Sequence, residues 1–382
     1  MQTVSVIKCK NYEINKVYTT IKESLKNINF KIPKNKTILL KPNVLGPHPP
    51  EKAITTHPII LEAVCKLLKE NNCKIWIGDS CGIADYGFTN KCFKVCKIEA
   101  VAKKYNAKLI AFETETATTI KDDKAKILKK INIAQAPLKA DLIINLPKLK
   151  THVLMKYTGA VKNMFGCIPG GLKSKLHSKA PREDLMGKLL LDIYQNVKPE
   201  LTIMDGIVGL EGNGPGVAGI PKKIGLILAS KDAVALDIIA TKIIGYNPMD
   251  IATIKFAIER GLLKNLNDIE VIGEKNVSIK YKKPDRLSKL ISKAPPWLTQ
   301  IFFILSSKRP YVDKDKCKRC RVCFKVCPVK AISMKPFPTF NRTKCILCYC
   351  CHENCPYDAI ILKRNRFMEF LQKFKQKIMG NS

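Results

Sequence analysis

The sequence predicts a large α/β domain with a mostly parallel sheet, followed by a small α+β domain. Two observations predict this division. Short β-rich runs alternate with helical patterns up to residue 283, whereas nine of the sixteen cysteines lie within residues 317–355. A chain of 382 residues is long enough for two or three domains of ordinary size.

Seven β-rich runs are the candidate strands of the large domain, and Gly and Pro punctuate the joins between them. The runs are Val4–Ile7, Thr37–Leu40, Lys74–Ile77, Lys108–Phe112, Leu142–Asn145, Leu201–Met204 and Ile224–Leu228. Helical periodicity marks Pro58–Glu70, Asp184–Asn196 and Asp232–Ile244. Because helices alternate with strands, most of the strands are expected to lie parallel.

Polar residues follow several of these strands at a similar position. They are Lys41-Pro42-Asn43, Gly78-Asp79-Ser80, Lys148 to His152, and Asp205-Gly206. Ligands of open α/β sheets bind outside the carboxyl ends of the strands, so this pattern predicts one polar cleft. At any single position, ordinary turn chemistry at a strand end is the alternative.

The stretch from Lys148 to Arg182 contains eight Lys and Arg residues and no Asp or Glu. Lysine offers a mobile point charge to phosphate or carboxylate, so the stretch predicts an anionic small-molecule ligand. A merely basic surface is the alternative. The candidate ligand-binding residues are Lys41, Lys148, Lys150, His152 and Lys162.

Residues 205–216 contain five glycines, which let backbone N–H groups converge on an anion or let the chain approach a ligand closely. The segment lacks a P-loop lysine and is not a G-x-G-x-x-G turn, so nucleotide binding is not predicted. Asp205 and Glu211 are candidates for binding a cation or for acting as acid and base. A flexible surface turn is the alternative.

Eight of the nine clustered cysteines form two runs of the pattern C-x2-C-x2-C-x3-C-P, 28 residues apart. In this spacing the fourth cysteine of each run ligates the cluster of the other run. The runs therefore predict two [4Fe-4S] clusters and single-electron transfer, and zinc sites lack the third cysteine and the proline. Cluster I takes Cys317, Cys320, Cys323 and Cys355, and cluster II takes Cys345, Cys348, Cys351 and Cys327. Cys350, between two ligands, is expected to be a spectator.

On these residues the segment 311–362 resembles the two-cluster bacterial ferredoxins. Residues 35 to 245, approximately, resemble a second family, the domain of unknown function 362 proteins. That resemblance rests on Lys41-Pro42-Asn43, Thr55 to Pro58, Gly78-Asp79-Ser80, Pro147 to His152, Tyr157 to Gly166, and Asp205 to Pro215. It implies that these segments belong to one module and that the ferredoxin is an attached electron port. No reaction follows from it.

The predicted boundaries are 1–283 for the α/β domain, 284–310 for a basic and apolar connector, 311–362 for the ferredoxin and 363–382 for a basic amphipathic helix. The connector contains a nine-residue apolar run, which is expected to pack the two domains together. The terminal helix is expected to dock on the protein's own surface. Peripheral membrane contact is the alternative for both, and partner docking is a further alternative for the helix.

The formal net charge is +35, from 67 Lys and Arg against 32 Asp and Glu. Two oxidised clusters with their thiolates reduce it to roughly +31, which still favours acidic partners such as a redox protein. The sequence has no nucleic-acid module signature, which argues against nucleic acid. Without an apolar signal or membrane-spanning segment, the chain is expected to be cytoplasmic.

Two functions follow from these observations. In the first, the protein is an iron–sulfur oxidoreductase whose clusters pass single electrons to or from an anionic ligand in the α/β domain. In the alternative, it is a non-catalytic electron-carrier subunit whose α/β domain docks onto an acidic partner complex. Substrate, donor and direction do not follow from the sequence.

Overall fold

The structure is a computed structural model that describes residues 1–82, 86–284 and 309–363. Nearly all of the predicted connector, 284–310, and of the predicted terminal helix, 363–382, lies outside the described residues. Within the described ranges, no helix has both the length and the apolar character required to cross a bilayer.

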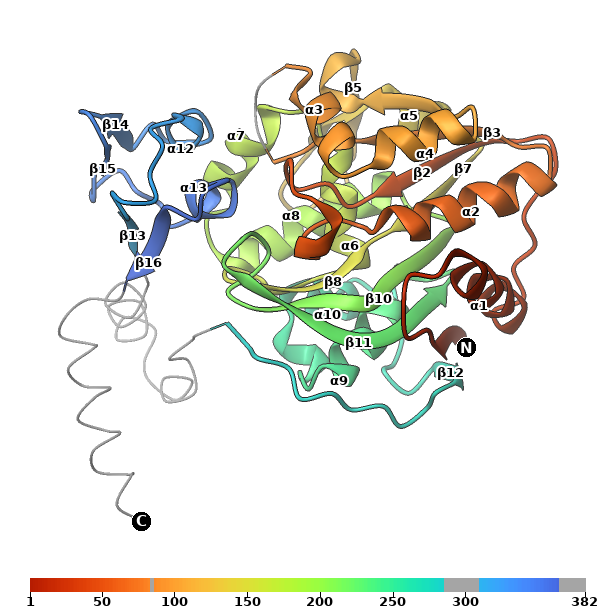
Figure 1. Cartoon of the computed structure of the whole chain (residues 1–382). Helices are drawn as coiled ribbons and strands as arrows, with labels where there is room; N and C mark the ends of the chain where they lie inside the picture. The colour runs from red at the N-terminus through yellow and green to blue at the C-terminus, as the bar shows by residue number, and fades with distance from the viewer. Residues whose placement is uncertain (83–85, 285–308, 364–382) are drawn as a thin grey trace.

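A mixed sheet forms the centre of the large domain (Figure 1). Its main strands are β1 (Gln2–Lys8), β2 (Thr37–Pro42), β3 (Lys74–Asp79), β4 (Lys108–Ala111), β7 (Leu142–Leu146), β10 (Leu201–Gly212), β11 (Gly219–Ser230) and β12 (Ile269–Gly273). They follow the order β12-β1-β11-β10-β7-β2-β3-β4. Only β11 runs antiparallel to its neighbours, β1 and β10, in this path. The prediction of a mostly parallel α/β sheet is confirmed, and each predicted strand overlaps one of these.

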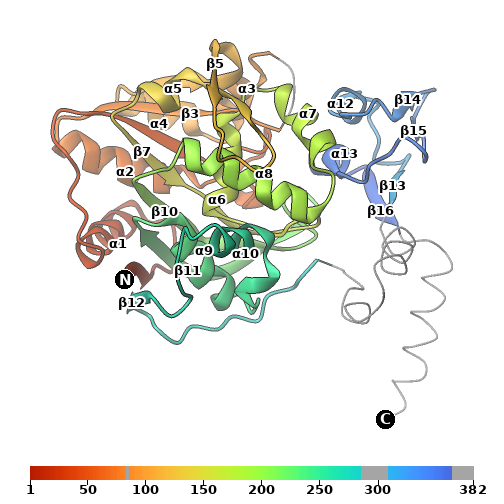
Figure 2. The same ribbon diagram turned by 180° about the vertical axis from the view of Figure 1, so that it is seen from behind.

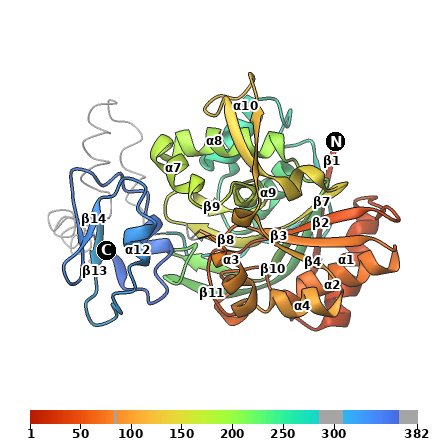
Figure 3. The same cartoon turned by 90° about the horizontal axis from the view of Figure 1, so that it is seen from above.

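Alternate residues of the strands face two different helical layers. In β2, Ile38 and Leu40 point into one hydrophobic core and Leu39 points into the other. The first core lies under α1 (Ile14–Asn27), α2 (Pro58–Glu70), α3 (Phe88–Val95) and α4 (Ile98–Lys104). The second lies under α6 (Ala160–Asn163), α8 (Glu183–Asn196), α9 (Ala233–Ile243) and α10 (Ala252–Glu259). Figure 3 shows the two layers on opposite sides of the sheet.

Local signals account for the ends of the predicted helices. Pro58 opens α2, where its missing N–H costs nothing, because the first N–H groups of a helix have no intrahelical partner. Asp232 caps α9, since its Oδ1 accepts hydrogen bonds from the N–H groups of Val234 and Ala235 at 2.8 and 2.9 Å. The smaller elements are η1 (Pro50–Lys52), η2 (Phe112–Thr114), β5 (Ala117–Lys121), β6 (Lys130–Ala134), α5 (Gln135–Lys139), η3 (Met164–Cys167), α7 (Leu172–Lys179) and η4 (Pro248–Asp250).

Two segments expected to be polar strand ends are themselves strands. Residues Lys148–His152 form β8, which is buried throughout and pairs with β10 and with β9 (Lys156–Thr158). β10 itself continues to Gly212, through most of the glycine-rich segment. Pairing between β8 and β10 satisfies backbone groups that would otherwise be left to turns, and this pairing is not visible in either segment alone.

The cysteine-rich segment is built from short elements beside the large domain. They are β13 (Arg309–Val312), α12 (Val322–Lys325), β14 (Ile332–Met334), β15 (Pro338–Phe340), α13 (Cys350–Glu353) and β16 (Ile360–Lys363). β13 pairs with β16 and β14 pairs with β15, both antiparallel. In Figures 1 and 2, α13 is the element nearest to the large domain, and β14 and β15 lie farther out.

Candidate functional site

The two cysteine runs share one backbone conformation. The N–H of Ala331 donates a hydrogen bond to Sγ of Cys327 at 3.2 Å, and the N–H of Ala359 donates to Sγ of Cys355 at the same distance. Residues with left-handed backbone also recur 28 positions apart, as Arg319 and Leu347, Arg321 and Tyr349, and Lys330 and Asp358. The repeat of the sequence is therefore a repeat of local geometry.

Two cavities in this segment are each lined by four cysteines. Cys317, Cys320, Cys323 and Cys355 line one, and Cys327, Cys345, Cys348 and Cys351 line the other. Each set takes three cysteines from one run and one from the other run, as the crossover rule requires for clusters I and II. In each set, four cysteine sulfurs, one of which accepts a hydrogen bond from a backbone N–H group, fit the ligand set of a [4Fe-4S] cluster.

Helix α13 lies between one of these cavities and a polar pocket. Cys351 lines the cavity of the predicted cluster II, whereas Cys350, Glu353 and Asn354 line the pocket. We call it the interdomain pocket, because its remaining walls come from the large domain. Its other polar and charged lining residues are Lys41, Asn43, Asp79, Ser80, Thr158, Lys162, Asn163, Lys173, Ser174 and His177. Cys350, expected to be a spectator between ligands, is thus part of a second site.

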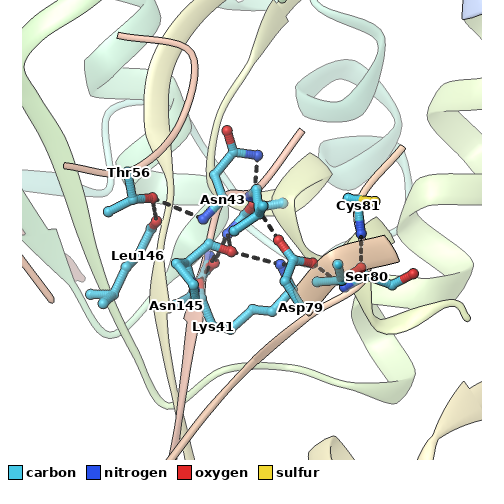
Figure 4. A network of polar contacts seen from close by, with 12 residues as sticks. Lys41, Asn43, Thr56, Asp79, Ser80, Cys81, Asn145 and Leu146 are labelled. Carbon is cyan, nitrogen blue, oxygen red and sulfur yellow. Dashed lines mark hydrogen bonds and ion pairs between the residues drawn. The ribbon is translucent and has the colours of Figure 1, made fainter. Parts of the chain in front are cut away.

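A buried ion pair forms one wall of the interdomain pocket (Figure 4). Nζ of Lys41 lies 2.8 Å from Oδ1 of Asp79, and both side chains are buried. The N–H of Val44 donates to Oδ2 of Asp79 at 2.8 Å. Burial raises the pKa of Asp79, and the charge of Lys41 opposes that shift. Lys41 is therefore matched by a carboxylate before any ligand arrives.

Gly166 allows η3 to approach this ion pair. A Cβ at position 166 would lie 2.1 Å from Oδ1 of Asp79 and 2.6 Å from Nζ of Lys41, which no side chain can tolerate. The polar strand ends of β2 and β3 and the segment Tyr157 to Gly166 therefore meet at one place. Two of the four polar strand ends of the predicted cleft meet here, whereas Lys148 to His152 and Asp205-Gly206 do not line the pocket.

Lys162 is the lysine of the pocket with the fewest partners. Nζ of Lys173 donates to the carbonyl oxygens of Ser80 and Cys81, whereas Lys162 makes no hydrogen bond or ion pair with any described residue. Burial lowers the pKa of Lys162, and the nearby carboxylate of Glu353 opposes this shift. A ligand that brings an anionic group would relieve the desolvation of this ammonium.

The pocket also contains a buried acceptor with no donor. Asn354 is 7% exposed, and its Oδ1 makes no hydrogen bond within the described chain. Oε1 of Glu353 makes none either, although Nε2 of His152 lies 3.5 Å away. A buried acceptor without a donor is costly, so a ligand with an N–H or O–H group would be favoured here.

The other predicted candidates lie outside the interdomain pocket. Lys148 and Asp205 form a buried ion pair at 2.8 Å, and Tyr12 donates to the same carboxylate at 2.8 Å. Lys150 donates to Oδ1 of Asn43 at 2.6 Å, and burial lowers its pKa well below the ordinary value. Lys148 and Lys150 therefore lie outside the pocket and are bonded to other groups of the protein.

His152 and Glu211 serve other contacts. Nδ1 of His152 accepts hydrogen bonds from the N–H groups of Leu154 and Met155 at 3.1 and 3.3 Å, and its Nε2 faces Glu353 of the cysteine-rich segment. Oε2 of Glu211 accepts from the N–H of Lys282 at 2.8 Å. Neither side chain lines the interdomain pocket.

The glycine-rich segment approaches the cysteine-rich segment instead of lining the pocket. A Cβ at Gly216 would lie 2.7 Å from the backbone oxygen of Glu353. The close approach that glycine permits is therefore an approach of backbone to backbone across the two parts of the protein. The sequence predicted close approach here but assigned it to a ligand.

The pocket residues that the sequence did not identify as candidates include Lys173, His177, Glu353 and Asn354. The first two lie in the acid-free stretch, which was a usable signal. Burial lowers the pKa of His177 to about 3, so its imidazole is neutral near pH 7. The last two lie between cluster ligands, and no local pattern distinguishes them from ferredoxin residues.

Two protein-family models match the chain, one in the large domain and one in the cysteine-rich segment. Residues 38–242 match the family described as Domain of unknown function (DUF362), and residues 310–333 match the 4Fe-4S binding domain. The second match indicates iron–sulfur binding, and such clusters transfer single electrons.

The chain is also similar to one curated protein in sequence and to one solved structure in fold. The thylakoid-associated protein sll1697 of Synechocystis sp. is 31% identical over 258 residues, which are 66% of this chain and 78% of that protein. The lactate racemase apoprotein from Thermoanaerobacterium thermosaccharolyticum superposes with a TM-score of 0.41 and 13% identity, over 64% of this chain. That match spans 57% of the racemase chain, which is less than two thirds of its length.

Proposed function

The chain belongs to the Domain of unknown function (DUF362) family, and we propose that it is an iron–sulfur oxidoreductase that exchanges single electrons with a small anion. The anion binds in the interdomain pocket. Two [4Fe-4S] clusters, held by the two sets of four cysteines, supply and accept the electrons.

One observation carries this proposal: α13 contributes to both sites. Cys351 belongs to the cavity of cluster II, and its neighbour Cys350 belongs to the interdomain pocket. A ligand in the pocket would therefore be separated from cluster II by a single helical turn. Short separation between redox centres is the geometry that electron transfer needs.

The pocket residues support a specific class of ligand. With Lys41 matched by Asp79 and Lys173 held by carbonyl oxygens, Lys162 remains to bind one anionic group. Oδ1 of Asn354 remains to accept a hydrogen bond from the ligand. The ligand is thus a small molecule with one carboxylate-like or phosphate-like group and at least one N–H or O–H group.

Lys150 serves this site indirectly. Lys150 holds Oδ1 of Asn43, and Nδ2 of Asn43 donates to Oδ1 of Asn163 at 3.1 Å. Both amides line the pocket. Replacing Lys150 would leave buried acceptors without a donor, so its effect on binding would be mixed with loss of structure.

The test therefore uses Lys162→Met, which keeps the length and the apolar stem and removes the charge. The full chain is purified anaerobically, and small molecules released on denaturation are identified and quantified by mass spectrometry. We expect one anion to accompany the native chain and to be retained about ten- to hundredfold less by Lys162→Met, since a charge-assisted hydrogen bond is lost.

The matched control is Lys124→Met, which removes an exposed lysine of the same domain. It should retain the anion at the native level, and both variants should keep the iron content of the native chain. Equal retention of the anion by Lys162→Met and the native chain would contradict the proposed pocket. If no anion accompanies any of the three chains, the proposed ligand class is wrong.

A further inference from the structure

The residues between the cluster ligands differ in charge between the two runs. Lys318, Arg319 and Arg321 stand between the first three ligands of the first run, and all three are exposed. None of them makes an ion pair with any described residue. The corresponding positions of the second run are occupied by apolar residues, Ile346, Leu347 and Tyr349, which are all partly buried.

These three basic side chains surround the first cavity together with an exposed aromatic ring. Lys318, Arg319, Arg321 and Tyr357 all line the cavity of the predicted cluster I, and Tyr357 is 46% exposed. Cys320 of the same cavity is also exposed. Arginine and tyrosine are enriched at protein interfaces, where they supply contact area and anchoring hydrogen bonds. We call these four residues the basic face.

The second run packs against the large domain and leaves no such face. Ile346 packs against one core of the α/β domain and Tyr349 against the other, and Cys348 is buried in the first of these cores. Cys320 of the first cavity is exposed, whereas the cysteines of the second cavity are buried or only partly exposed, so a carrier from solution can come closer to the first cavity. The second cavity instead adjoins the interdomain pocket through α13.

We propose that the basic face is the docking surface for an acidic one-electron carrier protein, which exchanges electrons with the centre held by the first cavity. In each transfer, one electron leaves the reduced carrier and reduces that centre by one electron, and no bond or proton is exchanged. The inference rests on the proposed iron–sulfur function but not on the ligand of the interdomain pocket.

Charge complementarity selects this partner over other acidic molecules. Residues 309–363 contain twelve Lys and Arg against four Asp and Glu, and Glu353 among the acids is buried. Such a face accelerates the encounter with a negatively charged protein by long-range attraction, which salt screens. Anionic membranes and nucleic acids would also be attracted, but their binding would not require the positive residues to encircle a redox centre.

The experiment is stopped-flow oxidation of a reduced, small, acidic [2Fe–2S] ferredoxin by the full chain with both clusters. The variant is Lys318→Glu with Arg319→Glu and Arg321→Glu. At low ionic strength we expect the second-order rate constant to fall about 10- to 100-fold relative to the native chain. At about 0.5 M salt the two rate constants should converge, because the attraction is then screened.

The matched control reverses three exposed lysines of the β5–β6 hairpin region, Lys121→Glu, Lys124→Glu and Lys130→Glu. It changes the net charge by the same amount and should retain most of the native rate. Excess dithionite should reduce all three chains to the same extent, which shows that the clusters are intact.

Several results would overturn the inference. They are an unchanged rate in the basic-face variant, an equal loss of rate in the control, and a native rate that does not depend on salt. Loss of binding to anionic vesicles or to RNA without loss of the carrier rate would assign the face to those partners instead. The pocket proposal fails separately, since a native chain that accepts electrons rapidly and carries no anion would contradict only that proposal.

Discussion

The two cysteine runs have one backbone and two different surroundings. Left-handed residues and N–H to sulfur hydrogen bonds recur at corresponding positions, so both runs are shaped for the same cofactor. Between the ligands, however, Lys318, Arg319 and Arg321 of the first run are basic and exposed, whereas Ile346 and Tyr349 of the second are apolar and pack against the large domain. The repeat thus conserves the backbone geometry around each set of four cysteines, while the intervening residues decide what each set can meet.

The largest expected effect comes from removing one ligand from each run. Cys320→Ser and Cys348→Ser should each lose about half of the iron, because each set of four thiolates is broken. With Cys320→Ser, the acidic carrier should no longer reduce the chain rapidly, although dithionite still should. With Cys348→Ser, the carrier should still deliver electrons, but none should reach the pocket anion.

Iron analysis, EPR spectroscopy and stopped-flow measurements under argon would separate these outcomes. Cys350→Ser is the matched control, since it changes a buried thiol between two ligands and should keep the native iron content. Identical behaviour of the two ligand variants towards the carrier would remove the functional difference between the runs.

A smaller effect is expected from exchanging residues between the runs. Ile346→Lys with Tyr349→Arg places charges against the cores of the large domain, which should destabilise the docked segment by about 2–3 kcal/mol. Anaerobic urea titration of the cluster absorbance should show a midpoint lower by about 1 M. The reciprocal exchange, Lys318→Ile with Arg321→Tyr, alters exposed residues and should change stability by no more than about 0.5 kcal/mol. Equal losses in both variants would mean that the second run is not the docked one.

The smallest of the three effects concerns the glycine that meets α13. Gly216→Ala would place a methyl group against the backbone oxygen of Glu353 and should cost about 1–2 kcal/mol in the same urea titration. Ile220→Ala, at an exposed position of β11, is the control and should cost less than about 0.5 kcal/mol. A neutral Gly216→Ala would show that the second run can be docked without this close approach.

Much of the fold could be predicted because its signals are local. Hydrophobic runs, the proline that begins α2 and the Asp232 cap of α9 mark elements that the structure contains at nearly the same residues. The strand β8 is not predicted by the sequence. Four of its five side chains are polar or charged, so apolar and polar residues do not alternate along it as they do in a half-buried strand. Its burial is decided by pairing with β10 and by buried partners for Lys148 and Lys150, which are Asp205 for the first and Asn43 for the second.

The candidate site was predicted in part, and the lysines show where sequence reasoning ends. Lys41 and Lys162 line the interdomain pocket, but Lys148 and Lys150 lie behind it, held by Asp205 and Asn43. All four are lysines in similar polar contexts along the chain. Whether each is free to bind a ligand depends on its neighbours in space.

The sequence by itself determined the ligand spacing, the repeat of 28 residues and the α/β class, because each is set by covalent distance or by periodicity along the chain. Only the tertiary structure decided that α13 touches both a cysteine cavity and a basic pocket, and that Ile346 and Tyr349 pack against the large domain while Lys318, Arg319 and Arg321 are exposed. Burial and ion pairing arise between segments distant in sequence, so no local pattern encodes them.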